Sequence, residues 1–162
     1  MAAPGIATEL REALSAVEPV LPTSRLLLVA LEPIAIDELG AIAARACAYS
    51  LPLQLKPVSA PGSAASTHAP WLPYDDGAFD IVLLYRLTSH SVAIALLLGE
   101  AARVLRPTGK LLMIERPDDF SFAPLPDSGA SHLLHQWLRE AGFAGVNFMP
   151  QTPTRLVAVA HL

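Results

Sequence analysis

The sequence predicts an α/β fold built on a mostly parallel β-sheet, and three observations support this prediction. Residues 79–85 (FDIVLLY) and 110–115 (KLLMIE) are short, nearly continuous apolar runs, as expected of strands covered on both faces. Between them, residues 92–105 carry apolar side chains at helical spacing, with Glu100 and Arg103 on the wetter side. Strand, helix and strand in this order indicate a right-handed crossover between parallel strands.

The helix of this crossover has recognisable ends and a predicted core face. Ser89 or Ser91 can cap its start, Pro107 stops it, and Thr108-Gly109 turns the chain. The residues expected to face the core recur every three or four positions: Val92, Ala95, Leu96, Gly99, Ala102, Val104 and Leu105. Before the first strand, Asp75-Asp76-Gly77 is typical of a turn.

Length and composition limit the class of protein. A chain of 162 residues fits a single domain, residues 1–162. No apolar run is long enough to cross a membrane, and the N-terminus lacks the features of a secretory signal. Lys and Arg are scattered singly and the net charge is −4, which argues against nucleic acid as a partner. A single cysteine, Cys47, excludes an internal disulfide and a cysteine-cluster metal site, and favours a cytoplasmic location.

The N-terminal part supplies the other half of the predicted sheet. Residues 1–24 form a helix (5–17, with Thr8 as an early cap) and a linker. Residues 25–31 (RLLLVAL) form the first buried strand, and residues 37–48 form a helix that holds Cys47 as an inert, packed thiol. Residues 51–58 form a second, short strand whose prolines suggest an edge.

The C-terminal part closes the sheet. Residues 117–129 form a loop, and Ser131 caps a helix that ends at Gly142. Residues 146–149 and 155–160 then form two strands that run antiparallel to each other.

Several of these segments resemble a known family. The pattern LPYDDGAFDIVLL…EAARVLRPTGKLLMIE resembles the second half of a class I S-adenosylmethionine (SAM) methyltransferase domain, and residues 138–143 continue it. The resemblance covers roughly residues 69–160 and implies a three-layer, Rossmann-like sandwich whose final strand is antiparallel. A complete domain of this kind fits another helix and strand between its second and fourth strands. The segment 59–76 starts with small, polar and proline-rich residues, so we expect a loop there and a sheet that lacks one strand.

The resemblance also implies where SAM would bind, and the sequence departs from the family there. Active relatives have a glycine-rich turn after the first strand, which lets backbone approach the ligand. The matching positions here contain no glycine: Ala30, Leu31, Glu32, Pro33 and Ile34. A carboxylate that holds the ribose is missing around Val58-Ser59, and His68 stands near the position of an acidic residue close to the adenine.

The loss of these contacts is large enough to weaken SAM binding substantially. A hydrogen bond to a charged group contributes roughly 1.5–3 kcal/mol, so two such losses weaken binding by about two to four decades. We therefore expect no catalytic residues and no SAM binding in this chain. The alternative, a small SAM-dependent methyltransferase with a divergent cofactor pocket, is motivated by the well-kept second half.

A glycine-free first motif in a domain of this length is similar to the N-terminal domain of the anamorsin family of cytosolic iron–sulfur protein assembly. The segments that carry this resemblance are RLLLVALEPIAIDELGAIAARA, the short stretch before FDIVLL, and EAARVLRPTGKLLMIERP. The resemblance implies a non-catalytic interaction domain whose partners include a diflavin reductase. Iron–sulfur clusters are expected only in a separate cysteine-rich region, because this chain has Cys47 alone.

The remaining candidates have plainer structural explanations. His132 and His135 share a helix face but lack a third ligand of suitable spacing, so no metal site is predicted. Asp118-Asp119 follows a strand at the edge where ligands bind, although a catalytic role is the minor interpretation. Aromatic residues expected to anchor the core or a loop are Trp71, Tyr74 and Trp137. An apolar interaction surface is expected at Phe120, Phe122 and Leu125.

Overall fold

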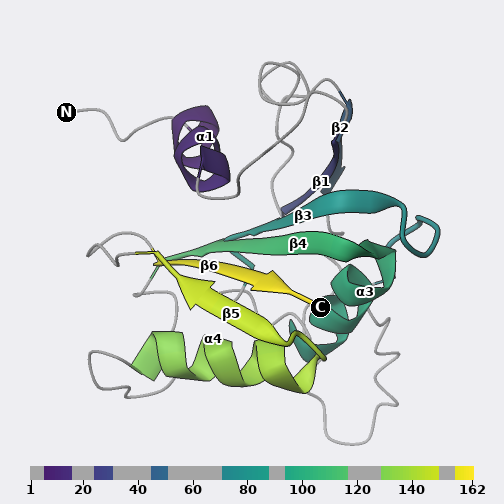
Figure 1. Cartoon of the computed structure of the whole chain (residues 1–162). Coiled ribbons are helices and arrows are strands. Elements are labelled where there is room, and N and C mark those ends of the chain that lie inside the picture. Colours follow the sequence, from purple (N-terminus) through teal and green to yellow (C-terminus); the bar gives the residue numbers. More distant parts are fainter. Residues whose placement is uncertain are drawn as a thin grey trace, which may run out of the picture.

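The computed structural model describes residues 6–15, 24–30, 45–50, 71–87, 94–116, 129–149 and 156–162. In these ranges the strands form a single sheet, and the helices lie on its two faces (Figure 1). The elements are α1 (Ile6–Ser15), β1 (Arg25–Ala30), β2 (Arg45–Ser50), β3 (Phe79–Tyr85), α3 (Ile94–Val104), β4 (Leu105–Glu115), α4 (Gly129–Glu140), β5 (Gly145–Phe148) and β6 (Leu156–His161).

The strands form one sheet in the order β2-β1-β3-β4-β6-β5. β2, β1, β3 and β4 run parallel, whereas β6 is antiparallel to both β4 and β5. Helix α1 lies on one side of the sheet, and α3 and α4 lie on the other (Figure 1). Among the described residues, β2 is the only strand beyond β1; the segment 59–70, where a strand was predicted to be missing, lies outside them. The predicted three-layer, Rossmann-like fold is confirmed.

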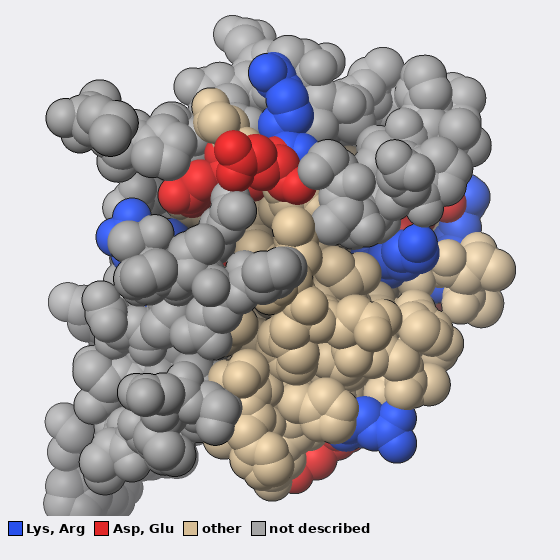
Figure 2. Space-filling view, turned by 60° about the vertical axis from the view of Figure 1, so that its left-hand side comes forward, with Lys and Arg blue, Asp and Glu red and all other residues tan. Residues whose placement is uncertain are grey.

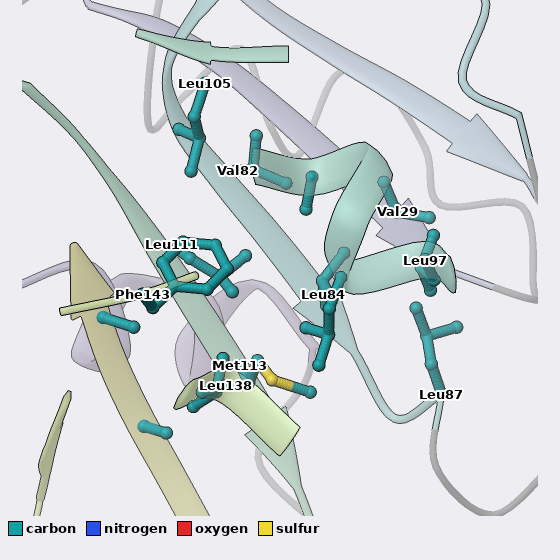
Figure 3. Close-up of a cluster of buried hydrophobic side chains, with 14 of the residues drawn as sticks. Val29, Val82, Leu84, Leu87, Leu97, Leu105, Leu111, Met113, Leu138 and Phe143 are labelled. Atoms are coloured by element: carbon teal, nitrogen blue, oxygen red, sulfur yellow. The ribbon is translucent and has the colours of Figure 1, made fainter. Parts of the chain in front are cut away.

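Strand β3 shows why its sequence reads as a continuous apolar run. Val82 and Leu84 belong to the core between the sheet and helices α3 and α4, whereas Ile81 and Leu83 belong to the core on the α1 side. Both faces are buried, so the alternation of a half-exposed strand is absent. Figure 3 shows the larger of these cores, in which the side chains of Leu84 (β3) and Met113 (β4) lie on the same side of the sheet as Leu138 of α4.

Helix α1 covers the opposite face with its second half. Ala13 and Leu14 are buried there against a core that includes Leu28, Ile114 and Val157. The helix predicted over residues 5–17 is thus confirmed, but Thr8 lies within it instead of capping its start.

The region around β2 corrects the sequence prediction. Residues 45–50 form a strand that pairs in register with β1, from Arg25↔Arg45 to Ala30↔Ser50, so the helix predicted over 37–48 is wrong for its last residues. Cys47 is exposed on this strand, and the expectation of a packed thiol is wrong too. A ladder of backbone hydrogen bonds to β1 outweighs the high helix propensity of the alanines in this segment. The second strand predicted over 51–58 lies outside the described residues.

Helix α3 has the predicted place but a different core face. Its buried residues are Leu97, Leu98, Ala101 and Val104. Leu96, predicted to face inward, is 48% exposed, and Ala95 and Gly99 are exposed as well. Three successive leucines allow two phases of the helix, and contact with β4 and α4 selects one of them.

The predicted turn at residues 107–109 is accommodated inside β4 as a bulge. The register with β3 jumps from Phe79↔Leu105 to Ile81↔Lys110, so residues 106–109 are left out of the ladder. A Cβ atom on Gly109 would lie 2.9 Å from the carbonyl oxygen of Arg106 and 3.0 Å from that of Asp80. Only glycine therefore fits at this position.

The C-terminal elements follow the prediction closely. β5 and β6 are antiparallel, as expected. Ser131, however, lies inside α4, which begins at Gly129, so it does not cap that helix.

Candidate functional site

The carboxyl ends of the four parallel strands meet at one edge of the sheet. Ala30 pairs with Ser50 at the ends of β1 and β2, and Tyr85 pairs with Ile114 near the ends of β3 and β4. Ligands of open α/β sheets bind outside this edge, which makes it the first candidate site. Ala30 is buried there, and the other positions predicted to be degenerate for SAM lie outside the described residues: Leu31, Glu32, Pro33, Ile34 and His68.

Tyr85 ties helix α1 to this edge. Its hydroxyl donates a hydrogen bond of 2.9 Å to Oε2 of Glu9. Burial raises the pKa of Tyr85 to about 12, and the hydrogen bond to Glu9 adds to the shift. The phenol is therefore neutral at physiological pH and acts as a hydrogen-bond donor, not as a base.

Glu115 fixes the chain where it leaves β3. Its side chain is fully buried at the end of β4, and Oε1 accepts a hydrogen bond of 3.1 Å from the backbone N–H of Leu87. The preceding residue, Arg86, has a φ of 51° and donates its own N–H to the carbonyl oxygen of Ile114 at 2.8 Å. A non-glycine residue in this conformation is uncommon, and such strain concentrates at functional sites.

A denser polar cluster lies at the opposite, amino-terminal end of the strands. The Arg103 guanidinium donates to the carbonyl oxygens of Tyr74 (2.8 Å) and Leu72 (2.9 Å) and pairs with Asp76 and Glu100, both at 2.8 Å. The hydrogen bond from Arg103 holds the pKa of Glu100 below its usual value, and the two carboxylates raise the pKa of Arg103.

This cluster, which we call the Arg103 clamp, fixes the segment before β3 onto α3. Glu100 also accepts a hydrogen bond of 2.9 Å from the N–H of Leu72. Asp76-Gly77 turns the chain, with Gly77 at a φ of 64°, so Asp75-Asp76 is turn chemistry as predicted. The clamp is structural, because its polar atoms are directed at one another.

The remaining predicted residues separate into three groups. Tyr74 and Trp137 are half-buried against the larger core, as expected of anchors, whereas Trp71 is 64% exposed and its predicted anchoring role is wrong. His132 and His135 are exposed on α4, and the described part of the chain holds no group of three metal-ligating residues. Five further candidates lie outside the described residues: Asp118, Asp119, Phe120, Phe122 and Leu125.

The site residues that the sequence prediction missed are Glu9, Tyr85 and Glu115 as hydrogen-bonding groups. The signal for Glu115 was available, because a carboxylate directly after a buried apolar strand is costly unless it is hydrogen-bonded. Nothing in the sequence pairs Glu9 with Tyr85, since 76 positions separate them.

Charged side chains are unevenly distributed on the surface. Figure 2 shows an uncharged area of described residues in its lower centre, with basic side chains along its right side and acidic ones at its margins. The described helices include none that is long and apolar enough to span a membrane.

Comparison with known proteins agrees with this architecture. A family model described as a methyltransferase domain matches residues 44–113, from the start of β2 into β4. Among solved structures, the chain is similar to a SAM-dependent methyltransferase from Aquifex aeolicus, with a TM-score of 0.62, 14% identity and coverage of 99% of this chain and 98% of that one. No curated protein matches the sequence significantly.

Two further structures are similar over most of this chain. One is a SAM-dependent methyltransferase from Thermotoga maritima, with a TM-score of 0.51, 16% identity and coverage of 91% of this chain and 86% of that one. The other is the trans-methyltransferase CalH in complex with SAH, with a TM-score of 0.51, 15% identity and coverage of 86% and 51%. The fold is therefore that of the class I SAM-dependent methyltransferases.

Proposed function

We propose that this chain is a methyltransferase-like domain that does not bind SAM and acts through protein contacts. The observation that carries the proposal is the lack of cofactor-binding residue types after the first two strands. β1 ends at Ala30, and no glycine occurs in residues 31–39. No aspartate or glutamate occurs anywhere in residues 39–74.

The second absence does not depend on where the second strand ends. Prediction placed that end near Val58, and the structure has β2 ending at Ser50, beside Ala30. Neither position is followed by a carboxylate before Asp75. A ribose would therefore lack its usual acceptor, and the cost of roughly 1.5–3 kcal/mol for that hydrogen bond stands for either strand assignment.

Titration calorimetry of the chain with SAM tests the proposal. We expect a dissociation constant two to four decades weaker than micromolar, because two charge-assisted hydrogen bonds are missing. A matched variant, Ser50→Asp, places a carboxylate at the end of β2 and should gain about one decade if the glycine-free turn leaves any room for the ligand. A low-micromolar constant for the unmodified chain would overturn the proposal.

The protein-contact part of the proposal follows the likeness to the anamorsin family. A diflavin reductase is the partner we propose, and residues 120–125 supply the apolar contact. Calorimetry between the chain and a purified diflavin reductase should give measurable heat that Phe120→Ala and Phe122→Ala together reduce at least about tenfold. Unchanged affinity in that variant would remove this surface from the proposal, and Trp71→Ala, at an exposed aromatic residue outside the segment 120–125, is the matched control.

A divergent methyltransferase is the second candidate. The match of the methyltransferase-domain model to residues 44–113 favours it. Tight SAM binding followed by transfer of a labelled methyl group to any acceptor would establish it, and the same titration separates the two candidates.

A further inference from the structure

A second candidate site is a cavity at the amino-terminal edge of the sheet. Its volume is about 450 Å³, within the range of roughly 300–1,000 Å³ that small-molecule sites occupy. Arg25 begins β1 and Ala30 ends it, so the cavity lies about 16 Å from the edge where ligands of this fold class bind, at about 3.3 Å per residue. The described lining residues are Arg25, Cys47, Pro73, Tyr74, Asp75, Ala78 and Phe79.

The lining residues belong to one face of the sheet. Leu27 of β1 is part of the larger core, and Arg25, two residues before it on the same strand, points to the same face. Cys47 is the register partner of Leu27 on β2 and shares that face as well. Phe79 belongs to the same core, and Tyr74 packs against it. The two strands and the segment before β3 therefore surround the cavity on the side of α3 and α4.

Arg25 carries a positive charge that is paired with no acidic side chain in the described part of the chain. The neighbouring carboxylate, Asp80, accepts the backbone N–H of Arg25 at 2.9 Å and pairs with Arg106 at 3.0 Å. The guanidinium of Arg25 makes one hydrogen bond there, from Nη1 to the carbonyl oxygen of Ala78 at 3.5 Å. This is longer than the roughly 2.7–3.2 Å of an ordinary N–H···O bond, so most donors of the guanidinium can serve a ligand.

Asp75 adds a negative charge to the same lining. Its neighbour Asp76 pairs with Arg103 in the clamp, whereas Asp75 forms no ion pair with any residue that the structure describes. Arg25 and Asp75 line one cavity without pairing with each other. The cavity thus offers two opposite charges at separate places.

The apolar part of the lining is aromatic and anchored in the core. The rings of Tyr74 and Phe79 meet edge to face, with 5.0 Å between their centroids and 88° between their planes. Phe79 is 5% exposed, and Tyr74 is half-buried against the larger core. Such a wall keeps its shape when a ligand enters, which lowers the entropic cost of binding.

We propose that this cavity binds a zwitterionic small molecule, an α-amino acid with an apolar side chain. The ligand carboxylate matches the planar fork of Arg25, its ammonium group matches the Asp75 carboxylate, and its side chain packs against Tyr74. A simple anion would meet the charge of Asp75 and a simple cation that of Arg25, so the lining selects a ligand that carries both charges. The proposal is independent of SAM binding at the carboxyl ends of the strands.

Cys47 gives a local readout, because it lines the cavity and is the only cysteine of the chain. The rate at which iodoacetamide alkylates Cys47 should fall as L-phenylalanine fills the cavity, and its concentration dependence gives the dissociation constant. Arg25→Gln and Asp75→Asn should each weaken binding at least about tenfold, since each removes a charge-assisted hydrogen bond. The matched control, Arg11→Gln, removes an exposed cation of α1 and should leave the affinity unchanged.

Two analogues of L-phenylalanine test the charges of the ligand separately. 3-Phenylpropionate lacks the ammonium group and phenethylamine lacks the carboxylate, so each should bind at least about tenfold more weakly. Binding of either analogue as tight as that of L-phenylalanine would overturn the proposal, and so would an alkylation rate that millimolar L-phenylalanine leaves unchanged. Circular dichroism checks that each variant is folded, and the analogues with the unmodified chain remain decisive if one is not.

Discussion

The two ends of the parallel strands are stabilised in different ways. At the amino-terminal end, charged side chains pair near the surface: the Arg103 clamp fixes the segment before β3, and Arg106 pairs with Asp80 at 3.0 Å. At the carboxyl end, the described contacts include buried or half-buried groups that each hold one neighbouring segment, Tyr85 on α1 and Glu115 on the chain after β3.

The two ends therefore depend on different kinds of polar contact. Exposed ion pairs contribute little individually, so the amino-terminal end depends on several partners converging on one arginine. A buried carboxylate is costly to leave without hydrogen-bond donors. The carboxyl end is also the end where this fold class binds ligands, so its polar groups fix the shape of that edge.

The largest effect is expected from breaking the Arg103 clamp. Arg103→Ala should lower the free energy of unfolding by about 3 kcal/mol, because two backbone carbonyls and the Glu100 carboxylate lose their donor. Arg103→Lys keeps the charge but not the planar fork, and should lose about half as much. Urea denaturation measures both. A loss below about 0.5 kcal/mol in the alanine variant would show that the clamp is only a surface ion pair.

A smaller effect is expected at the carboxyl end from Glu115. Glu115→Ala should cost about 2 kcal/mol, because the N–H of Leu87 loses its acceptor in a buried place. Glu115→Gln keeps an acceptor oxygen and should cost less than half of that. Equal losses in the two variants, measured by the same denaturation, would mean that the negative charge and not the acceptor matters.

The smallest effect is expected from Tyr85, and it depends on pH. Tyr85→Phe should cost about 1 kcal/mol at neutral pH, through loss of the bond to Glu9. The pKa of Tyr85 is raised from 10.0 to about 12 in the folded state, so the folded chain holds this proton more tightly than the unfolded chain. The stability that Tyr85 contributes is therefore fully present below pH 10 and is lost as pH rises towards 12.

The measurement for Tyr85 is the difference in unfolding free energy between the two proteins from pH 8 to 12. We expect this difference to shrink above pH 10, because Phe does not titrate. A difference that stays constant across this range would contradict the raised pKa.

The second half of the fold was predictable because its sequence signals agree with one another. The apolar run of β3 has the predicted bounds, Phe79–Tyr85, and the antiparallel pairing of β5 with β6 was also expected. The turn at Gly77 precedes β3 as predicted, whereas Gly109 lies in a bulge inside β4. Local propensity, hydrophobic period and turn chemistry point to the same structure here.

The errors occur where a distant partner decides the structure. β2 is a strand because β1 lies beside it, and the residues RACAYS alone do not show this. The phase of α3 depends on packing against β4 and α4, since Leu96, Leu97 and Leu98 are equally apolar. The polar contacts of the candidate sites, such as Glu9 with Tyr85, also join segments far apart in the chain and leave no local signal.

The bulge at Gly109 has a consequence for how this chain can vary. Side chains of a strand alternate between its faces, so a shift of β4 by one residue would turn Lys110 from the α1 side into the apolar layer beneath α3 and α4. Because a Cβ atom does not fit at position 109, the glycine there is needed for the bulge that sets the orientation of every residue following it in β4. A substitution at this glycine, although it lies in no proposed site, would therefore disturb the structure at both ends of β4.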